Sequence, residues 1–304
     1  MTRKKEKNMN EIVFSQSSIT ALWIITALCL LVPIVFFVIY FYSRKARISS
    51  FFIGTGMALL IVIAGRSILD MFFLLMLGLN NIFDSNEHPI YAVLYASVLN
   101  GFLIQFSTYL ALRFAMGDKT EKENMFFMTI GKSGLYCLVY GGVSAISYLA
   151  IAYTVNGSGI ENYLSSIADT ASREAQRATV ALQAAEPAVQ IVLDGLLQIG
   201  AMCTHIAVGT LIYVGLHQAK DILPANMLPK KKNAGADTSG LPWFVRYRRL
   251  MLPLAIVLQI ISFIPIFLLQ MGFFTDIAIV IIVLTLIYMA FVCVFCHKVY
   301  KQLR

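Results

Sequence analysis

Two charged residues lie inside a long apolar segment in the first quarter of the sequence. Arg66 and Asp70 are four positions apart in a hydrophobic run. Residues four apart share one face of a helix, so these side chains can form a charge-assisted pair. A charge in hydrocarbon is costly, and it therefore marks either such a structural pair or a proton or substrate pathway. We expect an intramembrane ion pair, with the pathway as the alternative.

A second set of polar residues is spread over later apolar segments. We expect these side chains to form a polar seam inside a helical bundle: Asn100, Gln105, Tyr140, Ser144, His205 and Gln259. Neutral hydrogen-bonding groups of this kind commonly hold transmembrane helices together. The set has one histidine and no carboxylate, whereas catalytic zinc takes three protein ligands. We therefore expect no metal site and no cofactor, and a Ser–His nucleophile stays open as an alternative.

These residues require membrane-spanning helices to position them. Hydrophobic residues make up 59% of the 304 residues and charged residues 13%, whereas soluble domains are about one half apolar and a quarter charged. A bilayer core about 30 Å thick needs roughly 20 apolar residues per helix, and runs of that length recur along the chain. We predict an all-α polytopic transmembrane bundle of about seven spans, near 20–42, 51–79, 89–115, 125–154, 190–217, 250–271 and 276–296.

The distribution of charge predicts the domain organisation and the topology. We expect a basic N-terminal tail at 1–19 and a single transmembrane domain at 20–304, with an external loop at 155–189 and a basic cytoplasmic loop at 218–249. Lysine and arginine gather beside the spans on the side that holds the C-terminus, which predicts a cell-membrane protein with its N-terminus outside and its C-terminus cytoplasmic. Because the basic residues flank spans and do not cover a polar domain, we expect no nucleic-acid partner.

Three local features remain. The Ala-, Ser- and Glu-rich segment 161–190 predicts a helix on the outer surface. Lys132 lies close to the start of the fourth span, so we expect its ammonium group to extend to the cytoplasmic surface. Asp194 lies near the outer end of the fifth span, where we expect it to reach water.

Three strings resemble a known family. Residues 101–113, GFLIQFSTYLALR, are similar to G-I-F-E-E-x-x-R-Y-x-x-x-R of the YhfC-type family of glutamate intramembrane proteases. Residues 140–146, YGGVSAI, are similar to the H-G-G-x-E-A-I of that family, and residues 258–265, LQIISFIP, resemble a later segment with histidine and an acidic or amide residue four positions on. The likeness extends loosely over most of the chain and implies a helical bundle that cleaves peptides within the membrane.

The chain departs from the family at the residues that carry this chemistry. The resemblance places the glutamate pair at Ile104 and Gln105, the arginine at Thr108, the histidine at Tyr140, the next glutamate at Ser144 and the later histidine at Gln259. Proteolysis of this type needs a carboxylate to activate water and a group that stabilises the developing charge. The first hypothesis is therefore a pseudoenzyme that binds a transmembrane segment or a lipid. Its partners would be the bilayer and another membrane protein or transmembrane peptide.

Two alternatives stay open. One is an active protease whose catalytic groups have moved, with Asp70, Asp194 and His205 as candidates. The other is a transporter or permease subunit, suggested by the charges at Arg66 and Asp70. Secondary transporters usually carry internal repeats, and the spacing of the predicted spans shows no repeat.

Overall fold

Helices account for all regular structure in the described part of the chain. The computed structural model describes residues 12–79, 82–83, 87–117, 120–167, 169–228, 241–273 and 275–304. Within them, seven helices are long and apolar enough to cross a membrane, which confirms the predicted all-α polytopic bundle. Residues 1–11 of the expected basic tail and 229–240 of the expected basic loop lie outside the described residues.

The first four spans contain π-helical segments, and the last three do not. In order, the spans are α2 (Gln16–Val38) with η1 (Ile39–Ser43); α3 (Ile48–Met57), η2 (Ala58–Ala64), α4 (Gly65–Asp70) and η3 (Met71–Met76); α5 (Pro89–Leu110) with η4 (Ala111–Met116); α6 (Lys122–Cys137), η5 (Leu138–Val143) and α7 (Ser144–Ser158); α10 (Ala188–Leu216); η7 (Arg248–Leu250) with α13 (Met251–Gln270); and α14 (Ala278–Gln302).

Short helices connect the spans. They are α8 (Ile160–Leu164), α9 (Thr170–Ala185), α11 (Ala219–Ile222), η6 (Ala225–Met227), α12 (Trp243–Arg246) and η8 (Thr275–Ile277). The helix expected within 161–190 is present as α9, and it begins at an N-cap aspartate. The carboxylate of Asp169 accepts a hydrogen bond from the backbone N–H of Ser172 at 2.7 Å, which satisfies one of the free N–H groups of the first turn.

The chain divides into two compact units, which are described separately. The first unit comprises Met1–Val32 and Leu138–Gln198. Its core is apolar and includes Phe14, Leu22, Leu149, Leu164 and Val180. The side-chain amide of Asn156 closes the end of α7 against the start of the chain, because it accepts from the N–H of Phe14 and donates to its carbonyl, both at 2.8 Å.

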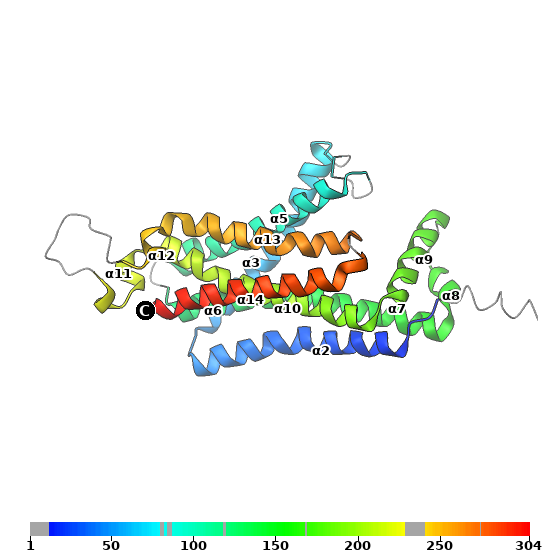
Figure 1. Ribbon diagram of the computed structural model, residues 1–304, viewed down its shortest axis with the longest axis horizontal. Coiled ribbons are helices and arrows are strands. Elements are labelled where there is room, and N and C mark those ends of the chain that lie inside the picture. The colour runs from blue at the N-terminus through cyan, green and yellow to red at the C-terminus, as the bar shows by residue number, and fades with distance from the viewer. Residues whose placement is uncertain are drawn as a thin grey trace, which may run out of the picture. The chain divides into compact units, whose positions relative to one another are not determined.

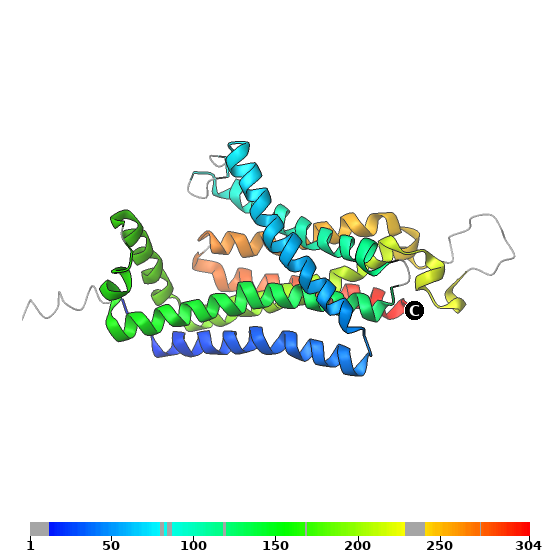
Figure 2. The same cartoon turned by 180° about the vertical axis from the view of Figure 1, so that it is seen from behind.

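The second unit comprises Pro33–Cys137 and Ile199–Arg304 and contains the larger core. Figure 1 shows α5 beside α13, and Figure 2 shows α3 crossing α6. Glycines permit the second of these contacts. A Cβ atom at Gly54 would lie 1.9 Å from the carbonyl oxygen of Met128, and one at Gly131 would lie 2.2 Å from that of Phe51. The α3 and α6 backbones therefore touch in the way that small residues allow in membranes.

Candidate functional site: a buried polar centre

Polar side chains gather in the interior of the second unit, on helices α5, α6, α10 and α13. Gln105, Lys132, His205 and Gln259 come from these four helices in that order, and each side chain is at most 1% exposed. Buried polar groups need hydrogen-bond partners, so the contacts of each residue show what the centre can do.

Two glutamine side chains join α5 to α13. The Nε2 of Gln105 donates to the Oε1 of Gln259 at 2.8 Å. The helices approach closely because Gly101 lies one turn before Gln105, where a Cβ would come 2.6 Å from the side chain of Ile260 and 2.9 Å from its backbone nitrogen. Within the described residues, the side-chain oxygen of Gln105 and the side-chain nitrogen of Gln259 have no hydrogen-bond partner. The pair therefore links two helices and leaves one acceptor and one donor free.

Lys132 points into the centre, and the expectation that it reaches the cytoplasmic surface is wrong. Its side chain is 1% exposed, and its ammonium group donates to the backbone carbonyl of Ile104 at 2.7 Å and to the hydroxyl of Thr108. The helix begins at Lys122, which places Lys132 about 15 Å along it, too deep for its four-carbon stem to return to water. Buried residues also surround α6 on nearly every side. In the described part of the chain, no carboxylate lies within ion-pair distance of this ammonium.

His205 is enclosed by aromatic rings. Its ring centroid lies 5.1 Å from that of Tyr136, edge to face, and 5.6 Å from that of Phe263. Neither ring nitrogen has a hydrogen-bond partner in the part of the chain that the structure describes. Lys132 is close enough to interact electrostatically with the ring. The imidazole therefore interacts with an ammonium group, whereas a catalytic histidine would need a carboxylate or a metal beside it.

The other seam residues are placed differently. Asn100 is buried on α5 and uses its amide locally, donating to the carbonyl of Ala96 at 2.8 Å. Tyr140 and Ser144 belong to the first unit, where Tyr140 is 39% exposed. Beside them, Gly141 packs against α2, because a Cβ there would lie 2.7 Å from the sulfur of Cys29. The structure thus brings together Ile104, Gln105, Thr108, His205 and Gln259 in the second unit.

Sequence reasoning missed Lys132 as a member of this centre, together with the aromatic enclosure of His205. One signal was available: Lys132 and Tyr136 are four residues apart and share a helix face, as Gln259 and Phe263 do. Which helix each face meets depends on contacts between residues far apart in the chain, and spacing alone does not give them.

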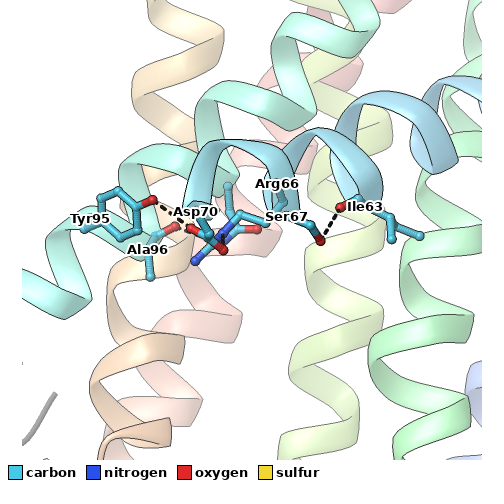
Figure 3. Close-up of polar contacts among 7 residues, drawn as sticks. Ile63, Arg66, Ser67, Asp70, Tyr95 and Ala96 are labelled. Atoms are coloured by element: carbon cyan, nitrogen blue, oxygen red, sulfur yellow. Dashed lines mark hydrogen bonds and ion pairs between the residues drawn. The ribbon is translucent and has the colours of Figure 1, made fainter. Parts of the chain in front are cut away.

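Arg66 and Asp70 form a separate polar site in the second span. The Nε of Arg66 lies 2.6 Å from the Oδ2 of Asp70, and the hydroxyl of Tyr95, from α5, donates to Oδ1 at 2.7 Å (Figure 3). The guanidinium carbon also lies 5.7 Å from the Tyr95 ring centroid. Both side chains of the ion pair are partly exposed, at 22% and 30%. The carboxylate thus has a partner on each oxygen.

Two carboxyl groups meet in the first unit. Glu186 precedes α10, and Asp194 lies on its second turn. Burial, reinforced by the neighbouring charge of Asp194, raises the pKa of Glu186 to about 7. The hydroxyl of Ser18 donates to the backbone carbonyl of Glu186 at 3.4 Å, which fixes this turn against α2. At neutral pH the pair can therefore hold one proton between two acids.

Comparison with curated proteins and with solved structures finds no match. Residues 28–230, more than half of the chain, match the family described as YhfC intramembrane metalloprotease. The matched region contains Ile104, Lys132 and His205 of the polar centre and ends before Gln259. With seven candidate spans and this match, the chain is a multi-pass membrane protein that belongs to the YhfC intramembrane metalloprotease family.

Proposed function

We propose that this chain is a non-catalytic member of its family, which binds a membrane component, a transmembrane segment or a lipid, without cleaving a peptide bond. The observation that carries the proposal is the position of Lys132. Its ammonium group is bound to the carbonyl of Ile104, the residue that the sequence resemblance aligns with the first glutamate of the family. The Lys132 amino group thus lies beside the backbone of a position where, by the resemblance, the family carries an acid that could activate water.

The family description implies a metal ion, which the sequence analysis did not expect. Among the described residues, no group of three or more His, Cys, Asp or Glu side chains could hold one. The centre offers one imidazole, two amides and an ammonium group, and amides and ammonium are not zinc ligands. The nearby positive charge of Lys132 also opposes the binding of a divalent cation to His205. These residues do not fit a catalytic metal, so we derive no hydrolytic step.

The contacts of the candidate acids support the same proposal. Both oxygens of Asp70 are occupied, by Arg66 and by Tyr95. Asp194 interacts with Glu186 in the first unit. His205 contacts aromatic rings, and its nitrogens have no partner within the described residues. A relocated active site would require one of these acids to hold a water molecule against a base.

The bundle itself supports a binding role. Seven candidate spans and the close glycine contacts between α3 and α6 form a packed scaffold, and the positions that the resemblance aligns with the family glutamates hold Ile104, Gln105 and Ser144. The Arg66–Asp70 pair is partly exposed on a span that carries large exposed apolar side chains, such as Ile68 at 60%. Polar groups at such a face favour contact with another polar membrane component over contact with lipid tails.

The decisive experiment is a cleavage assay. The full chain, purified in detergent, is incubated with a transmembrane peptide reporter with and without added zinc, beside a family member that retains the glutamates and histidine. We expect no cleavage by this chain and no zinc retained after dialysis. His205→Ala is matched by His217→Ala, which changes another buried histidine, immediately after the end of α10. Zinc-dependent cleavage that His205→Ala abolishes and His217→Ala preserves would overturn the proposal.

A further inference from the structure

A cavity of about 360 Å³ lies within the second unit, apart from the polar centre. Its walls come from α6, α10, α14 and the end of α2, and they include Phe126, Cys203, Ala207 and Cys293. This volume is within the range of roughly 300–1,000 Å³ typical of small-ligand sites. The walls are almost entirely apolar, so the occupant must be largely hydrocarbon.

One part of the cavity wall is polar and is surrounded by basic residues. Tyr300 lines the cavity, and the ammonium group of Lys122 lies 5.1 Å from its ring centroid. Arg44 interacts electrostatically with the same tyrosine, and Glu123 is the opposing charge nearby. Of the charged groups that act on Tyr300, two are basic, Lys122 and Arg44, and one is acidic, Glu123; the Lys122 ammonium also donates to the Leu303 carbonyl at 2.6 Å. The fully buried Thr210 also lines the cavity, and its hydroxyl has no hydrogen-bond partner among the described residues.

We propose that this cavity binds one acyl chain of an anionic phospholipid, with the lipid headgroup at Arg44 and Lys122. An apolar chamber with a cationic end is complementary to a lipid that carries a negative headgroup on a hydrocarbon chain. Charge favours an anionic lipid over a zwitterionic one, since each basic residue near an anionic surface contributes about 1 kcal/mol. The expected topology places the same end at the cytoplasmic leaflet, where anionic lipids are enriched.

The basic end of the cavity distinguishes a lipid from a transmembrane helix, because an anionic headgroup can pair with Arg44 and Lys122 and an apolar helix cannot. The inference rests on the proposed binding function and makes it more specific, because it names a lipid as the bound component. It does not depend on the proposal that the chain cleaves no peptide bond.

Native mass spectrometry can test the proposed lipid site, because a larger side chain in the cavity should displace the bound lipid. The full chain is incubated with dioleoyl phosphatidylglycerol or dioleoyl phosphatidylcholine, and the retained lipid is measured. We expect phosphatidylglycerol to be retained by the wild type and lost in Ala207→Phe, which fills the cavity. Leu284→Phe is the matched control, since Leu284 is 60% exposed on α14 and does not line the cavity. Equal retention of the two lipids by the wild type would contradict the inference.

The wild-type thiols provide a second measurement that needs no cavity-filling variant. Cys203 and Cys293 line the cavity and are partly accessible, whereas Cys29, Cys137 and Cys296 are buried. We expect phosphatidylglycerol vesicles to slow their alkylation by N-ethylmaleimide relative to phosphatidylcholine vesicles. Arg44→Gln should reduce this difference about fivefold, and the exposed Arg249→Gln should leave it unchanged. Identical alkylation rates in both kinds of vesicle would contradict the proposed lipid site, whatever the result of the cleavage assay.

Discussion

The ammonium nitrogen of Lys132 lies 2.7 Å from the carbonyl oxygen of Ile104, a residue 28 positions earlier in the chain. The same carbonyl accepts from the hydroxyl of Ser107 at 2.7 Å and from that of Thr108 at 3.1 Å. The Ile104 carbonyl oxygen thus accepts hydrogen bonds from three side chains of the polar centre. The cation is held by neutral dipoles, without a balancing carboxylate among the described residues.

Removing this charge with a side chain of similar length should not harm the fold. In Lys132→Met, the Ile104 carbonyl keeps two hydroxyl donors, and the cost of burying an ammonium group disappears. Replacement of buried ions by apolar residues of similar volume is often neutral or stabilising by about 1–4 kcal/mol. We expect thermal unfolding in detergent at an equal or higher temperature than the wild type. A lower unfolding temperature in Lys132→Met than in the wild type would show that the charge itself stabilises the centre.

The two central glutamines should be energetically coupled. Gln259→Leu removes the acceptor of Gln105 and leaves a buried amide without a partner, which costs about 1–3 kcal/mol. The double variant Gln105→Leu/Gln259→Leu removes both amides, so we expect it to be more stable than the sum of the single variants implies. Unfolding free energies of the four proteins in a double-mutant cycle measure this coupling. Strict additivity would mean that the 2.8 Å hydrogen bond has no net effect.

The hydroxyl of Tyr95 should contribute to the stability of the second span. Tyr95→Phe keeps the ring, which stacks on Phe83 at 4.6 Å, and removes only the donor to Asp70. A hydrogen bond to a charged group contributes about 1.5–3 kcal/mol, and partial exposure favours the lower end of that range. Tyr91→Phe on the same helix is the control, since Tyr91 is 54% exposed, and we expect a change below about 0.5 kcal/mol there. Equal effects of the two substitutions would count against a role for the hydroxyl.

Glu186 predicts a pH dependence of the first unit. Its pKa is raised from the ordinary 4.5 to about 7, so the folded chain binds more protons than the unfolded chain between these values. Stability should therefore fall as the pH rises through that window. Glu186→Gln should raise stability by about 1 kcal/mol near pH 8, after allowance for solvent screening, and change little near pH 5. Unfolding curves at both pH values test this, with the exposed Glu174→Gln as a control that should show no pH-dependent gain.

The spans could be predicted from sequence because each depends on a local property, the length of an apolar run. The arrangement inside the bundle depends on distant pairs: Gln105 and Gln259 are 154 positions apart, and Asp70 and Tyr95 are 25 apart. Lys132 was misplaced for a related reason. Its environment is set by the helices around α6, and a charged residue near a predicted span end gives no sign that the helix begins earlier and is enclosed.

The π-helical segments also limit what residue spacing can say about this family. In η5 (Leu138–Val143) each backbone hydrogen bond reaches one residue further than in an α-helix, so the turn is wider and the residue count across it increases by one. Tyr140 lies within this segment and Ser144 immediately after it. A spacing of four residues, such as that between Tyr140 and Ser144, therefore does not establish their relative positions across η5. The wide turn takes in one additional residue, so an α-helix one residue shorter would point the later side chains of the span in nearly the same direction.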